Sequence, residues 1–319
     1  MQWDPVETMR EFVLSSARHF HRRNGWFDND KLAGYQFANE FVDSPPRIRL
    51  VETNSSAVQV TDELPEWCAI KGRSGHSSRS ILLLERAQGI FYDWMREEPM
   101  TRQQVISFVE ELAYNRRIPG AIIERPVSPI GTLPFDVKVY VSHGSARLTL
   151  LTHRRKGEVR LRCYDSRQSP LDLISLIPNL QQLRDEEIPK GLFANGILRS
   201  ACQSAEKMAV RNEARFCRYD FLIGENGLVF SEISPCCGAL LYELVTAELV
   251  QRLVPPDLWC NHSRSASRRK SRVKRLVKAR AIESGNHRSV AAYQDFLEAE
   301  AISDQDVTIS EYYTHLALT

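Results

Sequence analysis

The sequence lacks a long apolar run, a Cys-x-x-Cys pair and a strong charge of either sign. No stretch reaches the ~18 apolar residues of a membrane-spanning helix, and residues 1–12 alternate charged and apolar side chains instead of forming the apolar core of a secretion signal. The seven cysteines are odd in number, which argues against a disulfide framework and favours a reducing compartment. We therefore expect a cytoplasmic protein with no membrane partner.

Glycine and proline are not enriched, at 15 residues each among 319. Their low combined share excludes a collagen-like or low-complexity chain, and 43% hydrophobic with 26% charged residues is typical of a globular protein. The formal net charge of +2 is too small to require a nucleic-acid or anionic-membrane partner. The length allows one large domain or two smaller ones with a sizeable core.

Hydrophobic periodicity predicts an alternation of short strands and helices after two N-terminal helices, within residues 1–25 and over 30–41. The expected strands cover 47–52, 67–71, 80–84, 121–124, 137–142 and 147–151, and the further helices 84–95, 101–115 and 196–210. Such a mixture with several hairpins predicts an α+β fold of antiparallel sheets backed by helices.

The clearest local prediction is a hairpin of two apolar strands, 217–223 and 228–234, joined by Glu225-Asn226-Gly227. With a three-residue loop, counting back places Asp220 opposite Glu232 and Arg218 opposite Ser234. Because side chains alternate along strands, these four would share one face. The opposite face would carry the apolar side chains of Tyr219, Phe221, Ile223 and Ile233.

Two carboxylates that face each other repel unless a cation lies between them or one takes up a proton. Magnesium is an economical solution, since it prefers oxygen ligands and accepts one or two carboxylates together with substrate phosphates. The alternative is a surface hairpin whose Asp220 and Glu232 are both solvated. The hairpin alone does not choose between these two interpretations.

A second candidate feature is the apolar strand that ends in Lys71 and continues into a small polar loop, 72–80. Backbone N–H groups of such a loop can approach phosphate oxygens while the lysine supplies a point charge. When these residues are taken alone, an ordinary solvated hairpin loop is the better explanation.

Taken in order, the motifs resemble the TupA-like (teichuronopeptide-biosynthesis) branch of the ATP-grasp ligases over roughly residues 28–245. The motifs that carry the resemblance are Asn29-Asp30-Lys31-Leu32, Leu64-Pro65, Ala69-Ile70-Lys71, Ile123-Glu124, Asp136-Val137-Lys138, Cys163-Tyr164-Asp165, Arg218-Tyr219-Asp220-Phe221 and Phe230-Ser231-Glu232-Ile233-Ser234. The resemblance implies an ATP-grasp fold, two α+β subdomains with antiparallel sheets that grip ATP between them.

The resemblance also implies roles for individual residues. Lys71 would contact the α and β phosphates, and Lys138, oriented by Asp136, would meet the γ-phosphate or an acyl phosphate. The nucleotide would further be held by the loop residues Ser74, Gly75, His76 and Ser77 and by the hinge residues Glu124, Arg125 and Val127. Magnesium would be held by Asp220, Glu232 and Ser234, the last standing where the family usually has Thr or Asn.

The implied activity is ATP- and Mg²⁺-dependent joining of a carboxylate to an amine through an acyl phosphate, in biosynthesis of a peptide, a modified polysaccharide or another secondary metabolite. Phosphoryl transfer needs in-line positioning and cations more than covalent help from the protein. The same residues would also serve an ATP-grasp phosphotransferase or a non-catalytic nucleotide-binding protein, so these alternatives stay open.

The expected domain division is a reduced helical N-terminal segment over 1–60, a small lid subdomain over 61–126, a metal-holding subdomain over 127–255 and a basic, then acidic, extension over 256–319. With a truncated N-terminal part, the acceptor would be held by the later parts or by another subunit, as in a homodimer. The basic stretch 264–280 either meets an anionic substrate or partner or is a solvated helix docked by its narrow apolar stripe.

Overall fold

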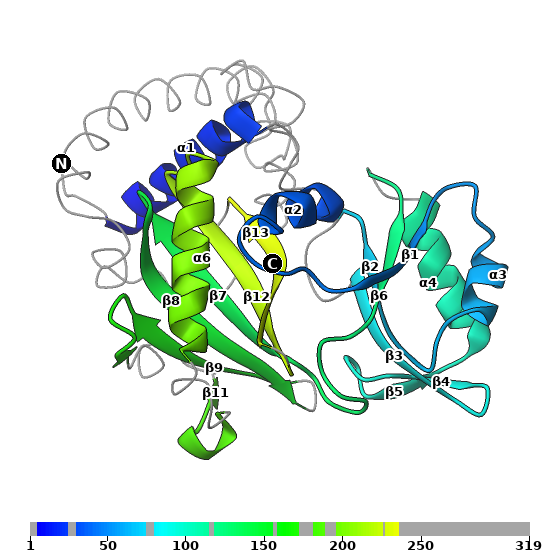
Figure 1. Ribbon diagram of the computed structural model, residues 1–319. Coiled ribbons are helices and arrows are strands. Elements are labelled where there is room, and N and C mark those ends of the chain that lie inside the picture. Colours follow the sequence, from blue (N-terminus) through cyan, green and yellow to red (C-terminus); the bar gives the residue numbers. More distant parts are fainter. Residues whose placement is uncertain are drawn as a thin grey trace, which may run out of the picture.

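The computed structural model describes the chain from α1 to the end of the last hairpin, with gaps. The described residues are 5–24, 30–74, 80–114, 118–155, 158–171, 181–188, 196–225 and 227–235. The predicted loop residues Gly75, His76 and Ser77 and the basic stretch 264–280 lie outside them. Figure 1 shows two sheets side by side, each with its own helices.

The first sheet has six strands in the order β1-β6-β2-β3-β4-β5, and all its neighbours are antiparallel. The strands are β1 (Arg47–Val51), β2 (Trp67–Gly72), β3 (Ile81–Ala87), β4 (Ile90–Asp93), β5 (Glu98–Met100) and β6 (Ala121–Glu124). Helices α3 (Ala57–Asp62) and α4 (Arg102–Tyr114) complete this lobe. The core between sheet and helices includes Ile70, Leu82, Val109 and Leu112, all with no exposed surface.

The predicted helix over 84–95 is wrong. The chain instead continues along β3 to Ala87 and returns as β4 from Ile90. Gln88 and Gly89 both have positive φ angles, +51° and +80°. Two consecutive positive φ values are the geometry of the tight turn that matches the twist of a hairpin. The apolar residues from Leu84 to Phe91 recur at a spacing that resembles that of a helix. Gly89 was the one residue in this segment that indicated a turn.

The second sheet has seven strands, with β10-β9-β8-β7-β12-β13 in order and β11 pairing with β9. The strands are β7 (Phe135–Ser142), β8 (Ser145–Arg155), β9 (Glu158–Asp165), β10 (Pro170–Leu171), β11 (Gln181–Gln182), β12 (Phe216–Gly224) and β13 (Gly227–Ser234). All these pairs are antiparallel except β11 with β9. The α+β class and its antiparallel sheets are therefore as predicted.

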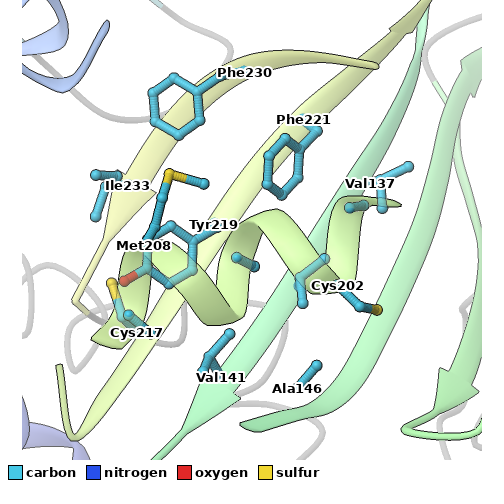
Figure 2. Packing of buried hydrophobic residues seen from close by; sticks show 14 of the residues in the cluster. Val137, Val141, Ala146, Cys202, Met208, Cys217, Tyr219, Phe221, Phe230 and Ile233 are labelled. Carbon is cyan, nitrogen blue, oxygen red and sulfur yellow. The ribbon is translucent and has the colours of Figure 1, made fainter. Parts of the chain in front are cut away.

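Helix α6 (Ile197–Arg211) covers one face of the second sheet (Figures 1 and 2). Its buried residues recur at helical spacing, and Met208 lies against Tyr219 of β12 in the same apolar cluster. Tyr219, Phe221 and Ile233 belong to this core, as the alternation of the predicted hairpin requires. The other face of β12 is thus left for the polar residues.

The register of the β12–β13 hairpin differs from the prediction in two ways, and the two differences cancel. Gly224 pairs with Gly227 rather than with Leu228, so the tip is one residue tighter than expected. A bulge next to Asp220 then inserts one extra residue into β13, and Asp220 pairs with Glu232 as predicted. The bulge also explains why Phe230 and Ile233, three residues apart, both enter the core.

Two N-terminal helices complete the described fold, α1 (Pro5–Asn24) and α2 (Lys31–Ala38). Asp30 caps α2 by accepting a hydrogen bond from the Leu32 amide. The Asp30 carboxylate also pairs with Arg73 of the first lobe at 2.5 Å, whereas Tyr35 packs edge-on against Phe230 of the second. Helix α2 therefore contacts both lobes, between which it lies in Figure 1. None of the described helices is long and apolar enough to cross a bilayer.

Candidate functional site

A charged network lies on the face of the second sheet that α6 does not cover. Strands β7 and β12 are neighbours, and their register places Lys138 directly opposite Asp220. The Lys138 ammonium donates to Asp220 Oδ2 at 3.0 Å and to Asp136, two residues earlier on its own strand. Burial alone would lower the pKa of Lys138, but Asp136 and Asp220 outweigh it and raise this pKa.

Arg218 adds a second cation to Asp220. Its Nε donates to Asp220 Oδ1 at 2.6 Å and its Nη2 to Oδ2 at 2.8 Å, a two-point contact between a guanidinium and a carboxylate. Only 4% of Asp220 is exposed. Both of its oxygens are therefore already engaged by cationic side chains.

Asp136 occupies the outer end of this network. Its Oδ2 accepts from Lys138, whereas its Oδ1 is buried and has no hydrogen-bond partner among the described residues. Burial raises the pKa of Asp136, and the Lys138 ammonium opposes that shift. A buried carboxylate oxygen without a donor is an acceptor available to a ligand.

The first sheet contributes a separate buried ion pair. Lys71 Nζ lies 2.6 Å from Glu124 Oε2, and the two side chains are 8% and 1% exposed. The β2–β6 register pairs Ala69 with Glu124 and Lys71 with Ile122, which places the two charges diagonally on one face. The structure thus brings together two residues that the sequence indicated separately.

Helix α2 contributes two more groups whose pKa values depend on charges of both sheets. Burial lowers the pKa of Lys31; the Glu232 charge opposes this shift, while that of Lys71 adds to it. Burial and the Glu124 carboxylate raise the pKa of Tyr35. Lys31 and Tyr35 therefore lie within electrostatic reach of charges on both sheets. Sequence reasoning missed them because their motif and helical pattern say nothing of what α2 packs against.

The predicted metal ligands lie on adjacent strands. Glu232 pairs with Asp220, and Ser234 pairs with Arg218. Carboxylate oxygens are the donors that magnesium prefers, but the described residues contain no group of three or more acids, histidines or cysteines able to hold a metal. The cations that offset Asp220 are Lys138 and Arg218, so the predicted repulsion does not itself require magnesium. The residues fit this ion only if phosphate oxygens or water complete its shell and Asp220 gives up a present bond.

The predicted hinge follows β6 and leads to β7. The exposed Arg125 donates its backbone N–H to the Pro46 carbonyl at 2.9 Å. Val127 packs closely under Gly224, because a Cβ added to this glycine would lie 3.1 Å from the Val127 carbonyl oxygen. The hinge thus contacts both lobes.

In the predicted phosphate loop, the buried Ser74 hydroxyl donates to the Ile118 carbonyl at 3.0 Å.

Comparison with known proteins gives structural neighbours only. No family model matches the chain, and no curated protein matches its sequence.

Among solved structures, the chain is similar to D-alanine–D-alanine ligase from Bacillus anthracis, with a TM-score of 0.40 and 12% identity over 66% of this chain and 57% of that one. It is also similar to the ADP complex of purK, N5-carboxyaminoimidazole ribonucleotide synthetase, with a TM-score of 0.40 and 10% identity over 66% and 46%. A third neighbour is the ATP-grasp ligase PsnB complexed with a minimal precursor, with a TM-score of 0.36 and 12% identity over 68% and 55%. The chain therefore spans about half the length of these neighbours. Similarity of this degree assigns neither a family nor an activity to the chain.

Proposed function

We propose that this protein is an ATP-dependent carboxylate–amine ligase of the ATP-grasp type, which forms an amide through an acyl phosphate. The observation that carries the proposal is the convergence of charges from both lobes. Lys138 and Arg218 share Asp220 on one sheet, and Lys71 pairs with Glu124 on the other. Lys31 lies within electrostatic reach of Lys71 and Glu124 on the first sheet and of Glu232 on the second. Several cations around one place are what a polyphosphate and its transferring phosphoryl group require.

The proposed roles follow the geometry of each group. Lys71 would exchange Glu124 for the α and β phosphates, and Lys138 would turn from its carboxylates to the transferred phosphoryl group. Arg218 would add charge at the same place, since it is joined to Lys138 through Asp220. The hinge with Arg125 and Val127 would line the adenine pocket through its backbone. Ser74, Gly75, His76 and Ser77 remain the proposed phosphate loop.

Magnesium belongs to the proposal as the ion that Glu232, Asp220 and Ser234 would hold together with the phosphates. When bound, it supplies positive charge to the phosphate oxygens. The chain itself provides the two carboxylates and the cations that surround them. The division into a lid subdomain over 61–126 and a metal-holding subdomain over 127–255, the cytoplasmic location and the homodimer also remain proposals.

The first test is nucleotide binding. We expect ATP with magnesium to raise the melting temperature of the full chain, because a ligand that binds only the folded state stabilises it by mass action. Glu232→Gln should reduce this shift and abolish turnover, since a neutral amide is a poorer ligand for a hard cation. Glu225→Gln, an exposed acid at the tip of the same hairpin, is the matched control and should leave both unchanged.

The second test separates the ligase from a phosphotransferase. Amino acids, short peptides and uronic acids would be screened with ATP, and products identified by mass. A ligase releases ADP and inorganic phosphate only with both substrates, and hydroxylamine traps its activated acid as a hydroxamate. A product heavier by a phosphoryl group, with no free phosphate, would instead establish the phosphotransferase. Absence of any thermal shift at millimolar nucleotide would remove the nucleotide site itself.

A further inference from the structure

Arg73 lies where the first lobe meets the N-terminus of helix α2. Its backbone N–H donates to the Gly120 carbonyl at 2.8 Å, and its carbonyl accepts from the Lys31 amide at 3.0 Å. Its guanidinium donates to Asp30 Oδ2 twice, from Nε at 2.9 Å and from Nη2 at 2.5 Å. Arg73 therefore ties the residue before β6 and the start of α2 to one point.

The Asp30 carboxylate serves both the helix and this junction. Its Oδ1 accepts from the Leu32 amide as the N-cap of α2, while its Oδ2 receives the two Arg73 donors. The Asp30 side chain is only 1% exposed. A buried charge is costly unless it is paired and hydrogen-bonded, and Arg73 provides both conditions. The N-terminus of α2 is thus held to the first lobe by charge as well as by its backbone.

The rest of α2 contacts the second lobe. The ring of Tyr35 packs edge-on against that of Phe230 on β13, with 6.1 Å between the ring centroids. After the helix, the Asp43 carbonyl accepts from the Phe230 amide at 2.7 Å. Strand β13 also carries Glu232. Helix α2 therefore joins the first lobe to the strand of a proposed magnesium ligand.

On the side of the first lobe, the junction lies at the start of the predicted phosphate loop. Arg73 follows Lys71 of β2 by two residues. Gly72, between them, leaves no room for a side chain, because a Cβ there would lie 2.6 Å from the Ser74 carbonyl oxygen. The Ser74 hydroxyl is itself held by the Ile118 carbonyl. The backbone from Lys71 to Ser74 therefore has a fixed course, and through Arg73 it is joined to α2.

We propose that Arg73 is a positioning residue: through Asp30 and α2 it sets the distance between Lys71 on the first sheet and Glu232 on the second. The inference rests on the proposed function, in which Lys71 meets the phosphates and Glu232 the magnesium ion. Lys31, beside Asp30, lies within electrostatic reach of both groups. A displacement of about 1 Å between groups that act on one substrate can cost about a hundredfold in rate. Arg73 acts here through α2 and does not itself touch the ligand.

The first measurement is the distance between the lobes, which needs no nucleotide. Spin labels would be attached to a ketone-bearing amino acid at two exposed positions, Ser107 of α4 and Lys207 of α6, so that the native cysteines stay unlabelled. Figure 1 shows these helices in different lobes. Pulsed double electron–electron resonance should give a narrow distance distribution for the wild type and a broader or shifted one for Asp30→Asn. Asparagine still caps a helix, so this change removes the charge and retains the cap.

The matched control is Arg102→Gln, because Arg102 makes a two-point contact with Asp62 within the first lobe alone. It should leave the distance distribution unchanged. The second measurement is titration calorimetry of the full chain with ADP and magnesium. Asp30→Asn should weaken the apparent affinity about five- to tenfold, since fewer molecules hold both lobes in place, whereas Arg102→Gln should bind as the wild type does. Arg73→Lys, which keeps a cation, should recover part of the affinity that Arg73→Gln loses.

If Asp30→Asn does not fold, Arg73→Gln and Arg73→Lys test the same junction from the more exposed partner. Distance distributions of Asp30→Asn and Arg73→Gln that match the wild type would overturn the positioning role. An equal loss of ADP affinity in Arg102→Gln would overturn it as well, because that ion pair does not join the lobes. If the wild type binds no ADP, the proposed nucleotide site is wrong, whereas the distance measurement still decides whether Arg73 places the two lobes.

Discussion

The two sheets arrange their buried charges in different ways. In the first, Lys71 pairs with Glu124, and this pair is almost dry at 8% and 1% exposure. The second holds a branched network in which Asp220 serves Arg218 and Lys138, and Asp136 at its outer end is 29% exposed. A closed pair must break before it meets a ligand, whereas an open-ended network can rearrange around one. For the proposed nucleotide site, we therefore expect the second sheet to rearrange first around the anionic ligand.

The largest expected effect compares removal of a charge from each arrangement. Asp220→Ala should destabilise the protein by about 3–5 kcal/mol, because Arg218 loses its carboxylate partner and Lys138 keeps only Asp136. Lys71→Met should cost less, since it leaves only Glu124 behind. Urea unfolding measures both, with a shifted midpoint at constant slope as the sign of a pure stability change.

The control for this comparison is Asp62→Ala, which removes an exposed partner of Arg102. Exposed ion pairs contribute little, so its unfolding midpoint should stay close to that of the wild type. If Asp220→Ala unfolded at the same urea concentration as this control, the network would not be a buried one.

Whether a contact of the candidate site could be predicted depends on how far apart its two residues lie in the sequence. The hairpin that carries Asp220 and Glu232 is local, and even its pairing was predicted, although a tighter tip and a bulge had to cancel. The Lys71–Glu124 pair required knowing that β6 lies beside β2, some fifty residues earlier in the chain. The bond from Lys138 to Asp220 likewise required β7 beside β12. Hydrophobic periodicity predicts which face of a strand is buried, but not which strand lies beside it.

A similar limit applies to the groups of α2. Its helical pattern was readable from the sequence, whereas the reach of Lys31 toward Glu232 and Lys71 depends on where the helix packs. The error over 84–95 had a local cause, because apolar spacing outweighed the turn signal of Gly89. Motif order indicated the candidate site residues, and the tertiary structure shows their present partners.

The next effect concerns two glycines at the junction between lobes. Gly224→Ala should cost about 1–3 kcal/mol, because its new Cβ would lie 3.1 Å from the Val127 carbonyl oxygen and 3.2 Å from the Val127 Cβ. Gly34→Ala on α2 should stabilise by about 0.5–1 kcal/mol, because it gains helix propensity and its Cβ meets Phe230 at an ordinary 3.8 Å. Thermal unfolding would show midpoints that move in opposite directions. Equal shifts of the two midpoints would mean that the chain around Val127 moves away from the new Cβ of Gly224→Ala at no cost in stability.

The smallest expected effect is a difference between the lobes in how stability depends on pH. Its sign follows from the pKa shifts of two carboxyl groups, Asp136 and Asp62. Burial raises the pKa of Asp136 in the network, so its ionisation opposes folding once the pH rises above the unfolded value of 3.8. The hydrogen bond from Arg102 lowers the pKa of Asp62, so its stabilising contribution is present above 3.8 and is lost as the pH falls through its folded value.

Urea midpoints measured over about pH 3 to 7 would compare the wild type with Asp136→Asn and with Asp62→Asn, since each amide removes one titration. Relative to Asp136→Asn, the wild type should lose stability as the pH rises through the raised pKa of Asp136. Relative to Asp62→Asn, it should gain stability over the acidic part of the same range. Because Lys138 opposes the shift of Asp136, the first slope should be modest, and its sign is the informative quantity. Parallel curves for all three proteins would show that Asp136 titrates as it does in the unfolded chain, and the second sheet would then lose its distinction as the more responsive of the two.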